Sequence, residues 1–206
     1  MSITSFLKVI GRGSKGAGDL DRNQAKEVFT QILDGKVSDL ELGAFCIAMR
    51  IKGESISELM GFMDAVEPHL NLLNLGSRPT IILPSYNGAR KQANLTPLLA
   101  GMLASYGFTV LVQGVEKDST RVTSHEIFKS LDWPILNSKN EFGTLLSSNQ
   151  PIFCPLNVIS PALQRLLDIR EQIGLRNTGH VLAKLINPTL QSPWQVSNYT
   201  HPEYPE

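Results

Sequence analysis

The chain has 206 residues, enough for one large domain or two small ones. Apolar residues make up 42% of it and charged residues 18%, so it can bury a core and global disorder is excluded. Nineteen Lys and Arg residues balance nineteen Asp and Glu residues. This balance excludes a uniformly basic or acidic surface but leaves room for a local basic face.

Cysteine usage and hydropathy favour the cytoplasm. Cys46 and Cys154 lie far apart among apolar neighbours, and neither belongs to a Cys-x-x-Cys pair. We therefore expect two buried, reduced thiols and no disulfide framework or zinc site. The N-terminus has no basic stretch before an apolar segment, and no run reaches the roughly 18 apolar residues of a membrane span. We expect a cytoplasmic protein that does not enter the membrane.

Residues 1–73 predict a compact bundle of short helices. Ser38 with Glu41, and Ser55 with Glu58, each form the spacing of a capping box, which marks the beginning of a helix. Apolar residues recur at helical spacing after each box, as expected for helices with one buried face.

From residue 80 the pattern changes to alternating strands and helices. Short apolar runs predict strands at 80–83, 108–112 and 151–154, and the segments between them predict helices at 95–106 and 124–131. This alternation predicts a sheet of parallel strands joined by right-handed crossovers.

The last third of the chain predicts a return to helices and then one more strand. Pro161 is suited to a helix start and Gly174 to a helix end, and residues 194–196 predict a fourth strand. We therefore expect an α/β protein with a helical bundle domain and a parallel-sheet domain. The bundle would comprise residues 1–73 plus 161–187, and the α/β domain residues 80–160 plus 190–206.

Several segments resemble one known family. Residues 37–54 are similar to the N-terminal helical domain of anthranilate phosphoribosyltransferases and their glycosyltransferase relatives, and residues 170–188 are similar to the helices that rejoin that bundle. Residues 82–99, together with 10–13, 19–22 and 199–204, resemble a DNA-binding branch of the family, the YbiB-like proteins. The resemblance implies an α/β domain of the phosphoribosyltransferase type and a homodimer formed through the helical domain. Because family members are longer, it also implies a chain that is truncated at its C-terminus.

The segment that binds diphosphate in the enzymes differs here. The enzymes carry a GTGGD turn after the first strand of the α/β domain, and this place reads Pro84-Ser85-Tyr86-Asn87-Gly88. A pyrophosphate cradle needs closely approaching backbone N–H groups, but Pro84 has none and Tyr86 adds bulk. Only Asn94 and Thr96 keep the enzymes' pattern. We interpret this segment as a degenerate diphosphate loop.

A second family segment differs as well. The enzymes carry KHGNR after the next strand, and this place reads Val112-Gln113-Gly114-Val115-Glu116, which puts a carboxylate where phosphates would bind. The enzymes' acidic magnesium-binding pair would fall beyond residue 206. These departures favour a binding protein over an enzyme, with no cofactor. The alternative is an anthranilate phosphoribosyltransferase-like enzyme that uses phosphoribosyl pyrophosphate and magnesium.

Basic segments supply the binding chemistry. Residues 1–26 carry five cations against two carboxylates, and Arg90-Lys91 stand at the start of a helix. Such cations neutralise phosphates without reading sequence, although a solvated loop is the alternative interpretation for each. We predict sequence-independent binding of DNA or RNA, and a domain that only self-associates remains a third possibility. The predicted phosphate-contacting residues are Lys8, Arg12, Lys15, Arg90, Lys91, Lys117, Arg121, Arg165, Arg170, Arg176 and Lys184.

Overall fold

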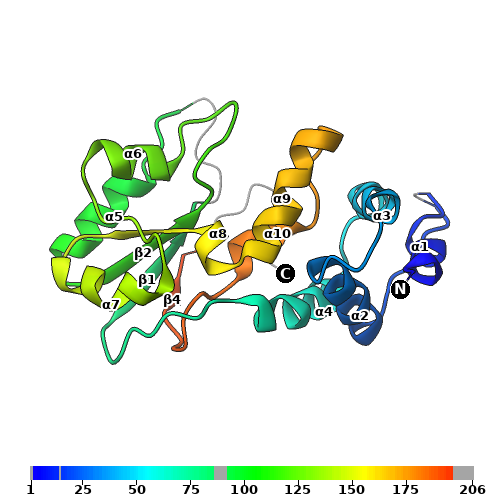
Figure 1. Cartoon of the computed structure of the whole chain (residues 1–206), viewed down its shortest axis with the longest axis horizontal. Coiled ribbons are helices and arrows are strands. Elements are labelled where there is room, and N and C mark those ends of the chain that lie inside the picture. Colours follow the sequence, from blue (N-terminus) through cyan, green and yellow to red (C-terminus); the bar gives the residue numbers. More distant parts are fainter. Residues whose placement is uncertain (1, 14, 86–91, 197–206) are drawn as a thin grey trace. The chain divides into compact units, whose positions relative to one another are not determined.

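The computed structural model describes residues 2–13, 15–85 and 92–196. The chain divides into two compact units (Figure 1): a helical unit of Met1–Leu70 with Ser160–Leu182, and a sheet unit of Asn71–Ile159 with Ala183–Glu206. The sequence placed residues 183–187 in the bundle, but they belong to the sheet unit. The reason is that the side chain of Gln113, in the sheet, donates hydrogen bonds to the carbonyl oxygens of Ala183 and Ile186.

Short capped helices build the helical unit, as the sequence predicts. The Ser38 hydroxyl accepts from the backbone N–H of Glu41, and the Ser55 hydroxyl accepts from that of Glu58. Both predicted capping boxes are thus confirmed. The helices are α1 (Thr4–Ile10), α2 (Arg22–Leu33), α3 (Asp39–Lys52), α4 (Ile56–Val66), the 3₁₀ turn η1 (Glu67–His69), α9 (Pro161–Ile173) and α10 (Gly179–Leu185), which crosses the division between the units.

Three phenylalanine rings fill the centre of this unit. Phe29 of α2, Phe45 of α3 and Phe62 of α4 have ring centroids 4.8–6.2 Å apart and are fully buried. Helix α4 approaches α2 closely at Gly61, where a Cβ atom would lie 2.7 Å from Cβ of Ala25. Only a residue without a side chain permits this distance between the helices.

The sheet unit contains four parallel strands in the order β3-β2-β1-β4. The parallel sheet and its fourth strand are confirmed. The strands are β1 (Thr80–Pro84), β2 (Thr109–Gly114), β3 (Ile152–Pro155) and β4 (Trp194–Gln195). The helices are α5 (Thr96–Ser105), α6 (Ser124–Ser130), α7 (Phe142–Leu145) and α8 (Leu156–Ile159), with 3₁₀ turns η2 (Lys139–Glu141) and η3 (Leu146–Ser148).

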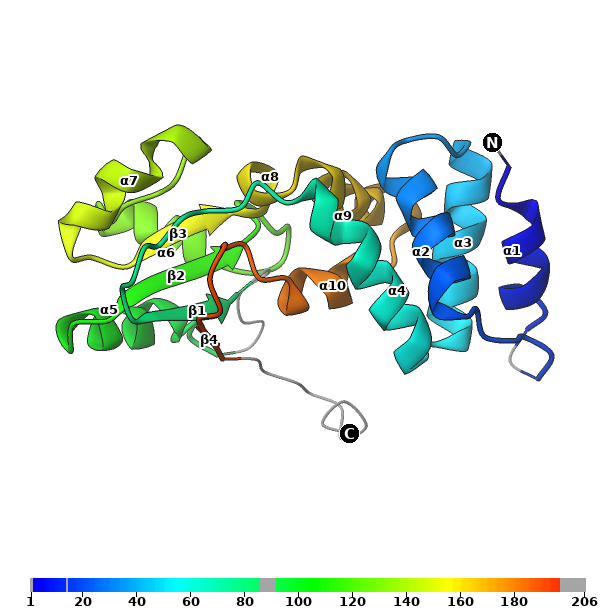
Figure 2. The same cartoon turned by 90° about the horizontal axis from the view of Figure 1, so that it is seen from below.

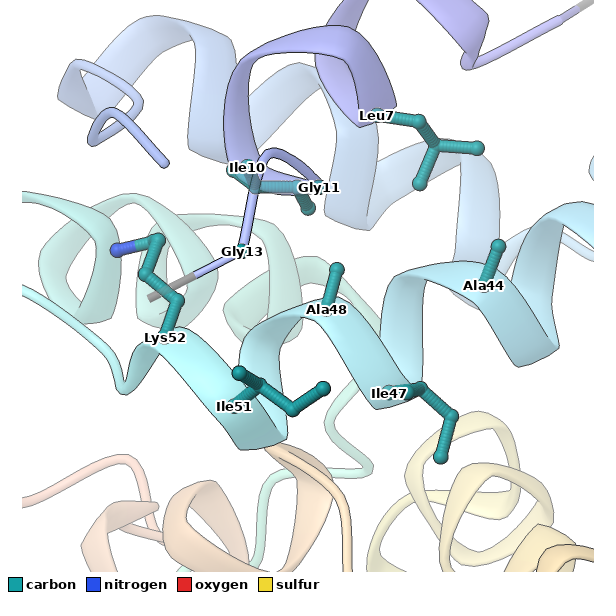
Figure 3. A pocket seen from close by; sticks show the side chains of 9 residues that line it. All are labelled: Leu7, Ile10, Gly11, Gly13, Ala44, Ile47, Ala48, Ile51 and Lys52. Carbon is teal, nitrogen blue, oxygen red and sulfur yellow. The ribbon is translucent and has the colours of Figure 1, made fainter. Parts of the chain in front are cut away.

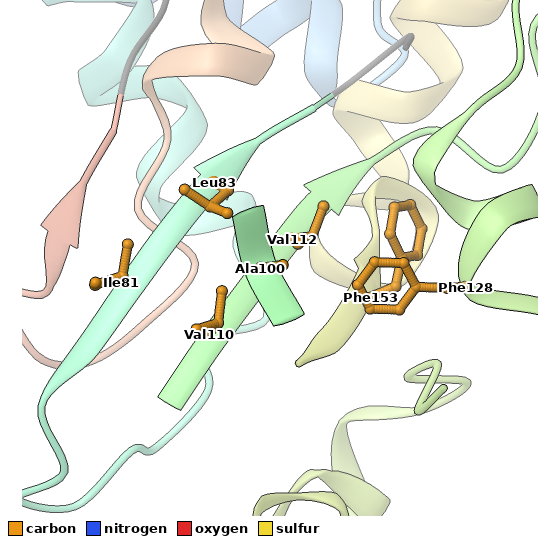
Figure 4. Close-up of a cluster of buried hydrophobic side chains, with 7 residues drawn as sticks. All are labelled: Ile81, Leu83, Ala100, Val110, Val112, Phe128 and Phe153. Carbon is orange, nitrogen blue, oxygen red and sulfur yellow. The ribbon is translucent and has the colours of Figure 1, made fainter. Parts of the chain in front are cut away.

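Helices α5 and α6 cover one face of the sheet (Figure 4). Ala100 of α5 and Phe128 of α6 pack on the strand side chains of that face, which include Ile81, Val110 and Phe153. The opposite face carries Leu111 and Gln113, because successive strand residues point to alternate faces.

Both cysteines are buried free thiols, as expected. Burial raises the pKa of the Cys46 thiol to about 11 and that of the Cys154 thiol further still, so both stay protonated and unreactive at neutral pH. Among the described residues, no helix is long and apolar enough to cross a membrane. The same residues contain no cluster of three or more side chains suited to a metal ion.

Candidate functional site

The carboxyl ends of β1 and β2 lie together at one edge of the sheet, where open parallel sheets bind ligands. Next to Pro84, the last residue of β1, the backbone N–H of Ser85 donates to the carbonyl oxygen of Gln113 at 2.8 Å. The hydroxyl oxygens of Ser85 and Ser124 are 2.7 Å apart, and Ser124 also accepts from the side-chain amide of Asn94 at 3.0 Å. Uncharged groups therefore hold the residues on either side of the degenerate diphosphate loop.

The predicted loop is described only at its two ends. Pro84, Ser85 and Asn94 have the positions given above, and the backbone N–H of Thr96 donates to Oδ1 of Asn94 at 3.3 Å. The predicted residues Tyr86, Asn87, Gly88, Arg90 and Lys91 lie outside the described residues.

Two carboxylates lie close to this edge. Glu126 closes the capping box of α6, where its Oε2 accepts from the backbone N–H of Thr123 at 2.8 Å. The Thr123 hydroxyl is 3.0 Å from the carbonyl oxygen of Glu116, whose own carboxylate lies 3.4 Å from Nδ2 of Asn157. A negative charge at the start of α6 already interacts with its backbone N–H groups.

Two buried polar atoms near this edge have no hydrogen-bond partner among the described residues. Gln113 is 1% exposed, and its Nε2 donates to Ile186 at 3.1 Å while its Oε1 accepts nothing. Nδ1 of His125 is also unpartnered, and its ring packs against Phe153 with centroids 5.4 Å apart. Sequence reasoning did not single out Ser124 or the side chain of Gln113 as structural polar groups.

In the helical unit, three predicted cations lie on one short segment. Lys8 of α1, and Arg12 and Lys15 in the following loop, are all exposed. Nε of Arg12 donates to the backbone carbonyl of Lys8 at 2.9 Å, which places the Arg12 side chain at the end of α1. None of the three forms an ion pair with a described residue.

Neighbouring cations of the same unit are neutralised instead. The Arg22 guanidinium binds the Asp64 carboxylate at 2.6 and 2.8 Å, which raises the pKa of Arg22. Nζ of Lys36 lies 2.7 Å from Asp34, and its hydrogen bond lowers the pKa of that carboxyl. The sequence could not separate paired from unpaired cations, because it does not show which carboxylates folding brings beside which cations.

Within the helical unit, the other predicted cations lie away from this segment. Arg165, Arg170 and Arg176 lie on and after α9, which packs on α2, whereas α1 packs on α3. Figure 2 shows α9, α2, α3 and α1 one after another across the unit, so α9 and α1 lie on opposite sides of it. Nη2 of Arg165 donates to the carbonyl of Leu33, so this cation also contributes to holding α9 on α2. Lys117, Arg121 and Lys184 belong to the sheet unit.

An apolar pocket of about 350 Å³ lies between α1 and α3 (Figure 3). Leu7, Ile10, Gly11 and Gly13 line it from α1 and the basic loop, and Ala44, Ile47, Ala48, Ile51 and Lys52 line it from α3. On the same side of α3, Ile51 of the pocket and Leu40 beyond it are 60% and 85% exposed. Sequence reasoning used only the buried stripe of α3. Helix α3 has a second apolar stripe, formed by residues 40, 44, 47, 48 and 51 at helical spacing. This stripe could have predicted the exposed apolar surface from the sequence.

Comparisons with known proteins agree with this fold. Residues 4–67 match the family model of the helical bundle domain of the glycosyl transferase family. The fold is similar to anthranilate phosphoribosyltransferase from Thermus thermophilus, with a TM-score of 0.71 and 22% identity over 84% of this chain and 53% of that one. It is also similar to the Saccharomyces cerevisiae enzyme in complex with phosphoribosyl pyrophosphate and magnesium, with a TM-score of 0.67 and 16% identity over 90% and 55%. The expected fold class is confirmed.

Sequence comparison adds two relatives. The chain is 42% identical to the uncharacterized protein YbiB of Escherichia coli over 99% of this chain and 65% of that protein. It is 26% identical to anthranilate phosphoribosyltransferase of Oceanobacillus iheyensis over 82% of this chain and 50% of that enzyme. The chain thus spans less than two thirds of the first relative and half of the second, and the resemblance to this family is supported.

Proposed function

We propose that this chain binds nucleic acid through the phosphate backbone, without reading its sequence. The single observation that carries the proposal is the segment with Lys8, Arg12 and Lys15, which are exposed and form no ion pair with any described residue. Cations without carboxylate partners are available to external phosphates, and their contact releases the counterions of the nucleic acid.

The edge of the sheet supports binding over catalysis. Pro84 ends β1 without an N–H group, Glu116 follows β2, and Glu126 stands in the first turn of α6. Carboxylates in segments that follow the strands of such a sheet disfavour the binding of an anion there. The polar groups that remain, Ser85, Ser124 and Asn94, are hydrogen-bonded to each other.

A titration with labelled single- and double-stranded DNA and RNA of unrelated sequences tests this function. Binding should be equally tight for unrelated sequences, and log K should fall linearly with log salt concentration. An absence of binding to every probe at low salt would rule out the proposal.

The proposed nucleic-acid-binding form is a homodimer joined through the helical unit. Support comes from the pocket between α1 and α3 and from the exposed apolar side chains beside it, because such surfaces are usually covered by a partner. Two copies of the basic segment on one particle would raise the effective concentration of the second phosphate contact after the first has formed.

The second candidate function is phosphoribosyl transfer with phosphoribosyl pyrophosphate and magnesium. The names of the relatives support this candidate more directly than the first, because one is an anthranilate phosphoribosyltransferase at 26% identity. The resemblance of residues 170–188 to these enzymes implies that Arg170 corresponds to the arginine that meets the acceptor carboxylate in them. Calorimetry with phosphoribosyl pyrophosphate and magnesium tests it: saturable binding, and release of pyrophosphate when anthranilate is added, would establish the enzyme.

A further inference from the structure

The pocket between α1 and α3 has the size and the lining of a site for a hydrocarbon chain (Figure 3). Its volume is about 350 Å³, within the usual range for sites that bind small molecules. Ala44 and Lys52, at the two ends of its α3 wall, are eight residues apart, so this wall extends about 12 Å along the helix axis. Apart from Lys52, the lining has no side chain that forms hydrogen bonds, so a polar ligand group would lose its water there without a new partner.

The charge of Lys52 is not available to a ligand in this pocket. Its Nζ donates hydrogen bonds to the carboxylates of Asp19 and Glu58, and its side chain is only 8% exposed. The methylene stem of Lys52 therefore adds to the apolar wall, while the ammonium is neutralised by these carboxylates. The charged end of a ligand has to find its partner on the other wall, at α1 and the loop that follows it.

The loop after α1 holds a cation beside the pocket. Gly11 and Gly13 both line the pocket, and Arg12 stands between them in the chain. Gly13 has a φ of 74°, and a Cβ atom on Gly11 would lie 2.7 Å from a backbone oxygen of α1, so both positions favour glycine. The backbone N–H of Gly18 donates to the carbonyl oxygen of Val9 at 3.0 Å, which turns the loop back onto α1. This backbone geometry keeps Arg12 next to the apolar lining.

The charge beside the pocket is complementary to an anion. Lys8, Arg12 and Lys15 are exposed and form no ion pair with a described residue. A guanidinium presents parallel N–H groups that bind a carboxylate at two points, and such charged hydrogen bonds are stronger than those between neutral groups. A hydrocarbon chain that ends in a carboxylate therefore matches both the lining and the neighbouring cation.

We propose that the α1–α3 pocket binds a free medium-chain carboxylate, with the hydrocarbon chain between the two helices and the carboxylate on Arg12. Removal of the chain from water supplies the affinity, and the ion pair with Arg12 fixes the orientation. This site goes beyond the phosphate contacts proposed above. It shares Arg12 with them, but the apolar lining takes a part of the ligand that a phosphate backbone does not have.

Calorimetry of the unmodified chain with hexanoate, octanoate and decanoate tests the proposal. Each ligand is kept below its micelle concentration, and two temperatures are used, because burial of apolar surface gives little heat near room temperature but a large negative heat-capacity change. Each added methylene should tighten binding about fourfold, the equivalent of about 0.8 kcal/mol. Decyltrimethylammonium, with the same chain length as decanoate but a cationic head group, should bind roughly tenfold or more weakly than decanoate. No nucleic acid is present, so the result does not depend on whether the chain binds nucleic acid.

Two variants separate the pocket from the contact with the head group. Ala48→Phe fills the pocket and should weaken octanoate and the neutral octanol alike, by roughly tenfold or more. Gly43→Phe adds the same ring to α3 outside the lining, where a Cβ meets nothing within 4 Å, and should change neither affinity. Arg12→Gln should weaken octanoate by roughly tenfold and leave octanol unchanged. Arg22→Gln, whose cation Asp64 already binds, should affect neither ligand.

Three results would overturn the proposal: no binding of any carboxylate at either temperature, an affinity that does not rise with chain length, or unchanged octanoate binding by Ala48→Phe. A second copy is the occupant instead if calorimetry shows no binding and sedimentation equilibrium shows a dimer in excess octanoate. A lipid surface is the ligand instead if the chain binds phosphatidylglycerol vesicles but none of the free carboxylates. The chain-length series on the unmodified chain gives an answer even if Ala48→Phe fails to fold.

Discussion

Lys52 and Glu58 form an ion pair in the interior of the helical unit, with Nζ 2.7 Å from Oε2 and side chains only 8% and 0% exposed. The second oxygen of Glu58 accepts from the backbone N–H of Leu20 at 3.0 Å, and Oε2 also accepts from that of Ser55. Burial disfavours the charged form of Lys52, but its hydrogen bonds to Asp19 and Glu58 outweigh this cost and raise its pKa. One carboxylate thus holds the segment before α2 against the α3–α4 turn.

Glu58→Ala should lower the free energy of unfolding by about 3–5 kcal/mol, because it leaves the backbone N–H groups of Leu20 and Ser55 without their acceptor and the buried ammonium of Lys52 with the exposed Asp19 as its remaining carboxylate. Urea unfolding, followed by the loss of the helical signal, measures this change in the free energy of unfolding. Asp19→Ala is the matched control, since Asp19 bonds the same ammonium but is 62% exposed, and it should cost about 1 kcal/mol or less. Equal losses would show that burial of Glu58 contributes nothing.

Glu41 should make the helical unit sensitive to acid. Hydrogen bonds from the hydroxyls of Ser2 and Ser38 and from backbone N–H groups lower its pKa from 4.5 to about 2. Its stabilising contribution is therefore present above pH 4.5 and is lost as the pH falls toward 2. Glu41→Gln should lower the melting temperature at pH 6. It should also make the melting temperature fall less steeply as the pH is lowered from about 5 to 2. Glu27→Gln, at an exposed position on α2, should leave that decline unchanged.

Gly61→Ala should destabilise the helical unit by about 1–3 kcal/mol or more, because its Cβ would clash with the carbonyl oxygen of Arg22 and lie 2.9 Å from the backbone nitrogen of Lys26. Gly43→Ala is the control within α3, where a Cβ would meet nothing within 4 Å. It should stabilise the helix by about 0.5–1 kcal/mol. Thermal unfolding should show a lower melting temperature for Gly61→Ala and a higher one for Gly43→Ala. A Gly61→Ala variant as stable as the unmodified chain would contradict the close packing of α2 and α4.

Changing Lys8, Arg12 and Lys15 together to Gln should weaken nucleic-acid binding to a similar extent for unrelated sequences. It should also reduce the slope of log K against log salt by about two to three units, since each lost phosphate contact removes about 0.9. Arg22→Gln removes a cation of the same region that Asp64 already neutralises. The slope of log K against log salt for this variant should therefore match that of the unmodified chain. An unchanged slope for the triple variant would exclude this segment from the interface.

Ile47→Glu with Ile51→Glu should dissociate the proposed homodimer, because both side chains belong to the exposed stripe of α3 and a buried carboxylate without a partner is costly. Sedimentation equilibrium measures the mass. Leu175→Glu, at an exposed position outside that stripe, should leave the dimer intact. A dimer that survives the double change uses another surface.

Helix starts were predictable because their signals are local. A capping box places both hydrogen-bonding partners within three residues, so Ser38 with Glu41 and Ser55 with Glu58 could be identified from spacing alone. Helices α7 and α8, of four residues each, were not predicted, because so short a segment shows no apolar period. The grouping of Ala183 with the sheet depends on Gln113, 70 residues earlier.

The candidate site was predictable in composition but not in arrangement. The chain showed which cations it carries, but it could not show that Arg22 and Lys36 are paired while Lys8 and Lys15 are not. Nor could it show that α9 and α1 lie on opposite sides of the helical unit, so that the basic residues of these helices do not form one cluster.

The sequence by itself determined the order and type of the main elements, the parallel sheet and the proline that ends β1, because capping, alternation and a missing N–H depend on neighbours along the chain. Only the tertiary structure decided which charges are neutralised, which apolar side chains of α3 and α5 are exposed among the described residues, and how Ser124 joins Ser85 to Asn94. These properties depend on groups that folding brings together from distant positions, and burial and electrostatic interaction act through space and not along the chain.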